Sequence, residues 1–311
     1  MRTYISFVIP AKNESGSVEK LFSEIKQLMK RVNKSYEIIF IDDGSTDKTF
    51  DEISKLAKKS RRVRAIKLRG NWGKSVALQV GFEHARGDIV FTMDADLQDN
   101  PKEIPRFLEK IDEGYDLVSG WKKTRHDPIT KVIPSRILNK TTALFTGLDL
   151  HDINCGYKAY RREVIEELNL YGELYRFIPI FAFKSNFRVA EIPVAHRQRR
   201  FGKTKYGWER NIKGLLDLLT VVFLTGYTRR PGHFFGFFGL LSFGAGFSIG
   251  LYITYLRVTT GSIQYRHPFL FFGMLLMIIG VQLVSTGLMA EMILSNRSKT
   301  DYSKIILERI N

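Results

Sequence analysis

The feature that most constrains this chain is a pair of long uncharged segments near its C-terminal end. Residues 234–256 and 268–290 each run for 23 residues without Asp, Glu, Lys or Arg. At about 1.5 Å of rise per residue, a helix of this length crosses a hydrocarbon core of about 30 Å. The sequence therefore predicts two transmembrane helices within residues 233–294. The alternative is a pair of buried helices in a soluble protein, but such helices seldom run this long without a charge.

The charges around these segments predict their orientation. The loop between them contains two arginines, whereas three basic residues lie in 211–230 and four follow the second segment. Basic flanks favour the cytoplasmic side of a membrane. We therefore expect a multi-pass protein of the cell membrane (plasma or inner), with both termini and the large N-terminal part in the cytoplasm.

Residues 211–232 join the N-terminal part to the first uncharged segment. Ile212, Leu215, Leu216 and Leu219 recur at helical spacing, and Pro231 interrupts the pattern. This arrangement predicts an amphipathic helix that lies in the membrane interface. An ordinary surface helix of the N-terminal domain is the alternative.

The formal net charge of +16 indicates an anionic partner, which could be nucleic acid, an acidic bilayer surface or a phosphorylated substrate. No nucleic-acid partner is expected, because the sequence contains no recognisable binding module and that function would leave both apolar segments unexplained. Cys155 is the single cysteine, which excludes an intrachain disulfide and a zinc site built on several thiolates.

The N-terminal part alternates apolar runs with helix-like stretches. Such alternation predicts an α/β fold with a mostly parallel sheet that is covered by helices on both faces. The carboxyl ends of parallel strands meet at one edge, where ligands bind. The predicted strands are 4–10, 36–42, 63–68 and 88–94, and the predicted helices are 17–32, 48–60, 74–86 and 101–113.

An acidic cluster follows the fourth predicted strand in the string "FTMDADLQDNP". Asp94 and Asp96 with the amide of Gln98 are hard oxygen ligands that suit Mg²⁺ or Mn²⁺, with phosphate oxygens completing the shell. A calcium loop of the EF-hand type is excluded, because Asp99 stands where that loop needs Gly and Pro105 where it needs Glu. A solvated acidic turn is the remaining alternative.

Lys74 lies in "GNWGKS", which resembles part of a phosphate-binding P-loop. The full pattern requires Gly at the position of Leu68, so the P-loop interpretation fails. Lys74 could still reach a phosphate from the first turn of a helix, or be an ordinary solvated lysine there.

The strings "FVIPAKNE", "IDDGSTD", "NWGKSVALQVG" and "MDADLQDNP" resemble family 2 glycosyltransferases in their order and spacing. Within that family the chain is most similar to the polyprenyl-phosphate glycosyltransferases, which include the dolichol-phosphate mannose synthase and bactoprenol glucosyltransferase groups. The resemblance implies a Rossmann-like GT-A catalytic domain at 1–210. An interfacial segment at 211–232, two transmembrane helices and a cytosolic tail at 295–311 would follow.

The same resemblance implies roles for individual residues on the donor side. Pro10, Ala11 and Glu14 would line the base and ribose pocket of a UDP- or GDP-sugar, and Asp43 would contact the base. Lys74, Asp94 and Ala95 would also contact the nucleotide. Asp94, Asp96 and Gln98 would hold Mg²⁺ or Mn²⁺. Lys12 departs from the aromatic residue often present at its position, which leaves the choice of nucleotide open.

On the acceptor side the resemblance implies a set of phosphate-binding residues. These are Arg125, Ser135, Arg136, Arg200, Lys203, Lys205 and Tyr206. Asp152, Asp96 and Arg200 would be catalytic, and Cys155 replaces the usual Ser or Thr of the motif that contains Asp152. We expect Asp152 to position the acceptor or the sugar, and not to act as an essential proton acceptor.

The predicted function is that of a membrane-bound inverting glycosyltransferase. It would move a hexose from a nucleotide-sugar to undecaprenyl or dolichyl phosphate. Two alternatives remain open, a glycosyltransferase with a hydroxyl acceptor and a non-catalytic nucleotide-binding subunit. Five glycines in the first span would allow close helix contacts in a homo-oligomer or within one chain, namely Gly236, Gly239, Gly244, Gly246 and Gly250.

Overall fold

The computed structural model describes residues 3–123, 142–143, 146–195, 197, 231–263, 265–295 and 306–310. The chain divides into two compact units. Met1–Val222 and Thr300–Asn311 form the first, and Phe223–Lys299 form the second. Residues 211–230 of the predicted interfacial segment lie outside the described residues. The predicted domain boundaries stay predictions.

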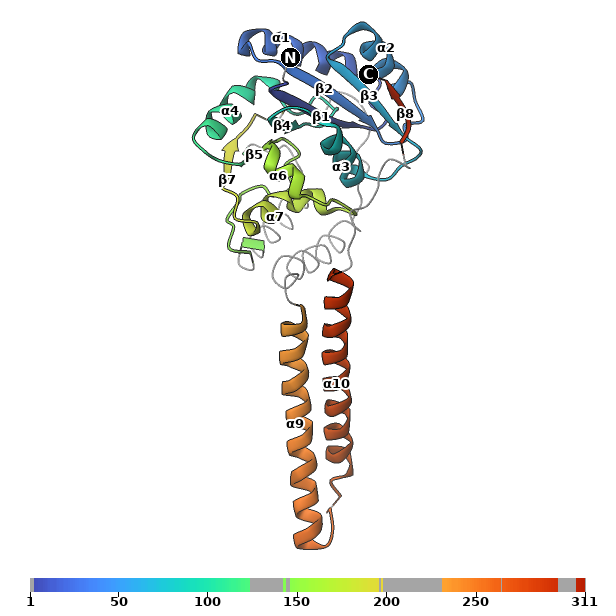
Figure 1. The fold of residues 1–311 in the computed structure, drawn as a ribbon, viewed down its shortest axis with the longest axis vertical. Coiled ribbons are helices and arrows are strands. Elements are labelled where there is room, and N and C mark those ends of the chain that lie inside the picture. The colour runs from blue at the N-terminus through green and yellow to red at the C-terminus, as the bar shows by residue number, and fades with distance from the viewer. Residues whose placement is uncertain are drawn as a thin grey trace. The chain divides into compact units, whose positions relative to one another are not determined.

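The first unit is built on one sheet of eight strands in the order β7-β5-β6-β4-β1-β2-β3-β8 (Figure 1). Neighbours among β1 to β4 pair in parallel, as do β5 and β7, whereas β6 and β8 are antiparallel to their partners. Because β6 reverses between β4 and β5, all strands except β6 and β8 end at the same edge. The strands are Ile5–Ala11, Tyr36–Asp42, Val63–Leu68, Ile89–Thr92, Leu117–Trp121, Lys158–Arg161, Val189–Pro193 and Ile306–Ile310.

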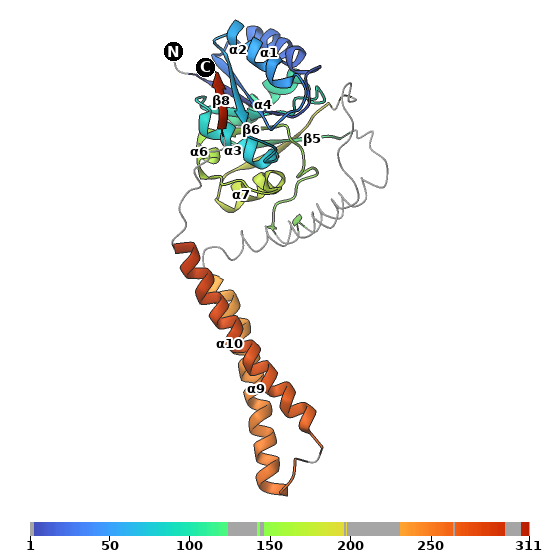
Figure 2. The same ribbon diagram turned by 90° about the vertical axis from the view of Figure 1, so that its right-hand side faces the viewer.

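Helices cover both faces of this sheet, as predicted (Figure 2). Alternate residues of β1 point to opposite sides, so Phe7 packs in one core cluster and Val8 in the other. The first cluster includes residues of α1, α2 and α4, and the second includes residues of α3, α6 and α7. These helices are α1 Val18–Val32, α2 Thr49–Lys59, α3 Lys74–His84, α4 Ile104–Asp112, α6 Arg162–Glu167 and α7 Ile178–Lys184, with 3-10 turns at Pro101–Glu103 and Leu174–Phe177.

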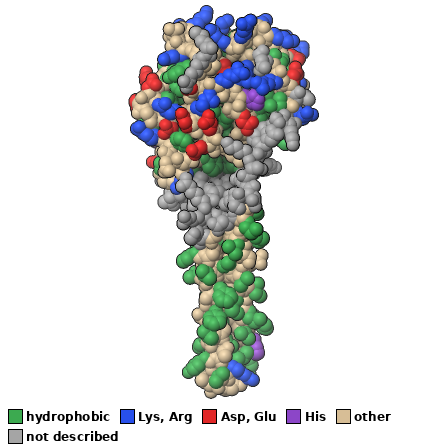
Figure 3. All heavy atoms as spheres, in the orientation of Figure 1, with side chains coloured by type: hydrophobic (Ala, Val, Ile, Leu, Met, Phe, Trp, Pro, Cys, Tyr) green, Lys and Arg blue, Asp and Glu red, His purple; other side chains and the backbone are tan. Residues whose placement is uncertain are grey.

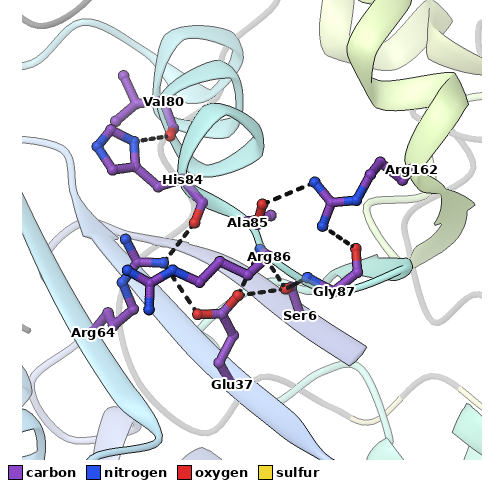
Figure 4. A network of polar contacts seen from close by, with 9 residues as sticks. All are labelled: Ser6, Glu37, Arg64, Val80, His84, Ala85, Arg86, Gly87 and Arg162. Carbon is purple, nitrogen blue, oxygen red and sulfur yellow. Dashed lines mark hydrogen bonds and ion pairs between the residues drawn. The ribbon is translucent and has the colours of Figure 1, made fainter. Parts of the chain in front are cut away.

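A buried polar network fixes the amino-terminal ends of the strands, opposite the edge described above (Figure 4). Glu37 of β2 is 6% exposed, and its Oε1 accepts hydrogen bonds from Ser6 Oγ and Arg86 N, both at 2.7 Å. Its Oε2 lies 3.1 Å from Arg64 Nη1, which also donates to His84 O. One carboxylate thus joins three strands to the connection that follows α3.

Strand β8 comes from the tail beyond the second apolar segment, which the sequence did not reveal as a strand. Its residues pair antiparallel with β3, with Ile306 opposite Leu68 and Ile310 opposite Ala65. The chain therefore returns to the first unit and covers an edge of its sheet. An uncovered edge presents unpaired backbone groups that promote aggregation.

Truncation before Ile306 is expected to lower the free energy of unfolding by roughly 2 kcal/mol, because the backbone hydrogen bonds of β8 to β3 are lost. Thermal unfolding and light scattering of the purified full-length and shortened proteins measure the effect. Removal of Asn311 alone, which follows the strand, is the control. Equal stability and solubility of both shortened forms would contradict a structural role for β8.

The second unit is a pair of helices, α9 Pro231–Thr260 and α10 His267–Ser295. Phe234–Thr260 and His267–Ala290 are long and apolar enough to cross a membrane, and only 11% of the most apolar window of each is buried. On the face seen in Figure 3, hydrophobic side chains are exposed along most of the length of this pair. Such exposure argues against the alternative of buried helices in a soluble protein.

Of the five glycines named for the first predicted span, two lie at the contact of α9 with α10. A Cβ added to Gly239 would lie 2.7 Å from Gly280 O, and one added to Gly246 would meet Gly273 O. These glycines therefore allow the two helices of one chain to pack closely. A Cβ at Gly236, Gly244 or Gly250 would meet nothing within 4 Å, and the homo-oligomer stays a prediction.

Candidate active site

The site begins with two loops that follow β1 and β2 at the common strand edge. Asp43 N donates to Ala11 O at 3.0 Å, so the two strand ends remain side by side. Glu14 is 8% exposed, and its backbone N donates to Thr49 Oγ1 at 2.8 Å. The structure thus brings Pro10, Ala11, Glu14 and Asp43, the predicted donor-binding residues of this part, to one place.

Asp43 links the end of β2 to the start of α3. Its Oδ1 accepts a hydrogen bond from Trp72 N at 2.7 Å, and its Oδ2 accepts one from Gly73 N at 3.0 Å. Burial raises the pKa of Asp43, although these two N–H groups oppose the rise. Gly73 has φ of +88°, a left-handed conformation that favours glycine, and the next residue, Lys74, begins α3. The turn thereby places Lys74 at the strand edge.

Lys74 forms an ion pair with Asp94, the first carboxylate after β4. Burial alone would lower the pKa of Lys74, but the charge and hydrogen bond of Asp94, together with Tyr175 and Asp99, hold that pKa above its ordinary value. Burial would likewise raise the pKa of Asp94, yet Lys74 and Lys122 hold it below its ordinary value. Both groups are therefore charged at neutral pH, and the Asp94 carboxylate already attracts a cation.

The loop 94–99 is shaped by its own polar groups. Asp99 is 2% exposed and its Oδ2 accepts from Asp94 N at 3.1 Å, while Oδ1 lies 3.6 Å from Lys122 Nζ. Asp96 Oδ1 accepts from Gln98 N at 3.1 Å. The amide Nε2 of Gln98 donates to Arg197 O at 3.4 Å, and Arg197 N donates to Gln98 O at 3.0 Å. Gln98 thus joins this loop to Arg197, and its role as a metal ligand stays a prediction.

The donor set at this loop fits a divalent cation that is shared with a phosphate. Among the described residues, no group of three or more His, Cys, Asp and Glu could form a metal site by itself. Mg²⁺ commonly takes only one or two carboxylates and completes its shell with water and substrate phosphates. Asp94 and Asp96 supply such a pair of carboxylates.

The segment that precedes β6 lies against this loop. Thr92 Oγ1, in β4, donates to Gly156 O at 2.7 Å, and a Cβ at Gly156 would lie 2.9 Å from both Asp94 Oδ2 and Lys74 Nζ. Asp152 is 1% exposed, and its backbone N donates to Glu191 Oε1 at 2.9 Å. The structure therefore places the segment of Asp152 beside the ion pair of Asp94 and Lys74.

Two buried titratable groups, Cys155 in this segment and Lys158 at the start of β6, were not assigned a role from the sequence. Burial lowers the pKa of Lys158 to about 8, and its Nζ donates to Cys155 O. Burial raises the pKa of Cys155 to about 12, so its thiol is neutral where the family motif usually has Ser or Thr. The substitution preserves a small, uncharged side chain at this position.

All seven predicted acceptor-binding residues lie outside the described residues and stay predictions. They are Arg125, Ser135, Arg136, Arg200, Lys203, Lys205 and Tyr206. Conversely, sequence reasoning missed Lys122, Lys158 and Glu191. Lys122 directly follows β5, and recognition of "DLVSGW" as a strand would have placed it at the same edge.

Known proteins resemble this chain in sequence and in fold. The sequence profile described as glycosyl transferase family 2 matches residues 6–169. Dodecaprenyl-phosphate galacturonate synthase of Rhizobium johnstonii is 36% identical over 96% of this chain and 90% of its own length. Undecaprenyl-phosphate 4-deoxy-4-formamido-L-arabinose transferase of Klebsiella pneumoniae is 36% identical over 93% of this chain and 88% of its own length.

Among solved structures, glucosyl-3-phosphoglycerate synthase of Mycobacterium tuberculosis, in complex with Mn²⁺, UDP-glucose and phosphoglyceric acid, superposes with a TM-score of 0.56. The similarity covers 71% of this chain and 80% of that one at 23% identity, so it concerns the fold alone. The GT-A fold is thereby confirmed. The profile match and the two relatives that align along more than nine-tenths of the chain show that this protein is an enzyme of glycosyl transferase family 2.

Proposed function

We propose that this enzyme transfers a sugar from a UDP- or GDP-sugar to a polyprenyl phosphate, either undecaprenyl or dolichyl phosphate. One observation carries the proposal. Two relatives named for polyprenyl phosphates align over 96% and 93% of the chain, an extent that must include at least part of the apolar helices. Their names specify different sugars, so the hexose expected from the sequence is one member of a wider class of donors.

The donor nucleotide would bind across the loops after β1, β2 and β4. Pro10, Ala11 and Glu14 would contact the base and ribose, and Asp43 would accept a hydrogen bond from the base. Asp43 is suited to that role because two backbone N–H groups hold its carboxylate in one orientation. Lys74, with Asp94 and Ala95, would face the diphosphate.

Asp94 and Asp96, with Gln98, would hold Mg²⁺ or Mn²⁺ against the diphosphate. The ion would supply positive charge where negative charge develops on the departing nucleoside diphosphate. Lys74 contributes a second cation beside Asp94. Without a cation, the carboxylates of Asp94 and Asp96 would repel the diphosphate of the donor. The proposed ion would neutralise them and so allow the donor to bind.

The acceptor phosphate is itself the nucleophile. The second pKa of a phosphate monoester is about 6, so the acceptor phosphate is largely dianionic at neutral pH. Such a nucleophile needs little help from a general base. Arg125, Arg136, Arg200 and Lys205 would offset its repulsion from the donor phosphates. Asp152 would position the acceptor or the sugar. A single displacement at the anomeric carbon would convert an α-linked donor into a β-linked lipid sugar.

The pairing of β8 with β3 supports the proposed membrane topology. Met1–Val222 and Thr300–Asn311 belong to one compact unit, and an even number of spans between them would keep both parts on the same side of the bilayer. The distribution of basic residues favours the cytoplasm for that side, in the plasma or inner membrane.

Chelation of divalent ions by EDTA is expected to abolish turnover, because the carboxylates of Asp94 and Asp96 would then face the diphosphate without a neutralising cation. Addition of excess Mg²⁺ or Mn²⁺ is expected to restore the rate. Release of nucleotide from the sugar donor measures both effects. Undiminished turnover in EDTA would contradict the proposed metal site.

The donor and acceptor are tested together by incubating membranes that contain the enzyme with polyprenyl phosphate and a panel of UDP- and GDP-sugars. The mass of the lipid product identifies the sugar that is transferred. A glycosylated diacylglycerol in place of a polyprenyl product would support the alternative with a hydroxyl acceptor. Metal-dependent nucleotide binding without any product would support a non-catalytic subunit.

A further inference from the structure

Glu191, in β7, makes three contacts with two consecutive residues of the segment that leads into β6. Its Oε1 accepts a hydrogen bond from Asp152 N at 2.9 Å, and its Oε2 accepts one from His151 N at 3.0 Å. Oε2 also lies 2.9 Å from Nδ1 of the His151 ring. The side chain of Glu191 is 9% exposed. A shielded carboxylate with these partners is held in a single orientation.

The residues that Glu191 holds are supported from a second side. The ring of His151 stacks on Trp121 with centroids 4.1 Å apart and planes 20° apart. Trp121 ends β5, and β5 pairs in parallel with β7, where Ser119 lies opposite Glu191. Two adjacent strands of the sheet therefore fix the position of the segment that carries Asp152. Groups supported by strands are held more exactly than groups on loops alone.

We propose that Glu191 is a positioning residue of the active site and acts through the backbone of Asp152. The inference rests on the proposed function in one respect, the role of Asp152 in placing the acceptor or the sugar. Displacement of a catalytic group by about 1 Å can cost roughly 100-fold in rate. Glu191 need not touch a substrate to have this effect.

The chemistry of the contact provides a sharp substitution. The two backbone N–H groups donate to different oxygens of the carboxylate, Asp152 N to Oε1 and His151 N to Oε2. An amide has one oxygen and one NH₂ group, so in Glu191→Gln a donor faces an N–H donor at nearly unchanged volume. Glu113→Gln is the matched control, because Glu113 is exposed and pairs only with Lys110 in the described contacts.

The first test is a double-mutant cycle on turnover. Glu191→Gln is expected to lower kcat about 10- to 100-fold, with the affinity for nucleotide unchanged within about two-fold. The double variant Glu191→Gln/Asp152→Ala is expected to be no slower than Asp152→Ala alone, because both changes act on one group. If the losses of kcat in the two single variants multiplied in the double variant, the proposal would be overturned. It would also be overturned if His151→Ala alone lowered kcat as much as Glu191→Gln, because the effect would then act through the His151 ring.

The second test does not depend on activity. Hydrogen exchange of peptides that cover residues 148–157 is expected to become faster in Glu191→Gln and to stay unchanged in Glu113→Gln, because one of the two amides, of His151 or Asp152, loses its acceptor. Unchanged exchange in Glu191→Gln would overturn the proposal. Absence of turnover in the wild-type enzyme would instead refute the proposed function. The hydrogen-exchange result would still decide whether Glu191 positions the backbone of Asp152.

Discussion

Replacement of Asp94 by asparagine is expected to lower turnover about 100- to 1,000-fold in an enzyme that remains folded. The carboxylate of Asp94 forms the ion pair with Lys74 and is the first proposed ligand of the divalent cation. Loss of one group that stabilises developing charge typically costs about 3–4 kcal/mol in the transition state. Each factor of ten in rate corresponds to about 1.4 kcal/mol, so this loss slows the reaction roughly 10²- to 10³-fold.

The asparagine variant isolates the charge, since its amide oxygen can still accept a hydrogen bond from Lys74 Nζ. Steady-state kinetics with saturating donor measure the effect, and thermal unfolding checks the fold. Asp112→Asn, at an exposed position in the last turn of α4, is the control and is expected to retain the wild-type rate. If Asp94→Asn kept more than about a tenth of wild-type turnover, electrostatic stabilisation of this size at Asp94 would be untenable.

Replacement of Glu37 by alanine is expected to produce the largest loss of stability, about 3–5 kcal/mol in the free energy of unfolding. The change leaves the guanidinium of Arg64 buried at 5% exposure without its carboxylate. It also removes the acceptor of Ser6 Oγ and Arg86 N. In a domain of this size the loss corresponds to a fall of roughly 10 °C in Tm.

Differential scanning calorimetry of the purified protein measures this shift. Glu113→Ala removes a carboxylate from an exposed ion pair with Lys110 and is expected to change the free energy of unfolding by less than about 0.5 kcal/mol. Nucleotide affinity of Glu37→Ala, measured well below its Tm, is expected to match that of the wild type, because the network lies at the other ends of the strands. A stability loss no larger than that of the control would show that the network is dispensable.

The parallel half of the fold could be predicted from the sequence for a physical reason. Strands covered on both faces are continuously apolar, and each of the four predicted runs is followed by polar residues and a helix. The predicted helices 17–32 and 48–60 are confirmed as Val18–Val32 and Thr49–Lys59. The predicted helix at 101–113 is present as a 3-10 turn followed by α4.

Strands β6 and β8 could not be predicted in the same way. The four residues "KAYR" of β6 have no distinctive period, and "ILERI" of β8 belongs to the sheet only because the chain returns after the second span. Tertiary pairing, not local sequence, makes these segments strands.

In the site, sequence motifs predicted which loops meet, but not how their side chains are arranged. Lys74 and Asp94 belong to different elements, and their contact depends on the left-handed turn at Gly73. Glu191 lies 39 residues beyond Asp152, and only the positions of β7 and the segment before β6 bring the two together. Contacts of this kind are set by the sheet order, which no local pattern in the sequence contains.

The central claim, that a lipid phosphate is the nucleophile, is tested most directly with a matched pair of acceptors. The purified enzyme is given its preferred nucleotide-sugar, Mg²⁺ or Mn²⁺, and either undecaprenyl phosphate or undecaprenol, which differ only in the phosphate. We predict a product with the mass of a sugar linked to undecaprenyl phosphate, no product from the alcohol, and no product with Asp94→Asn on the same time scale. Glycosylation of undecaprenol at a comparable rate would contradict the account.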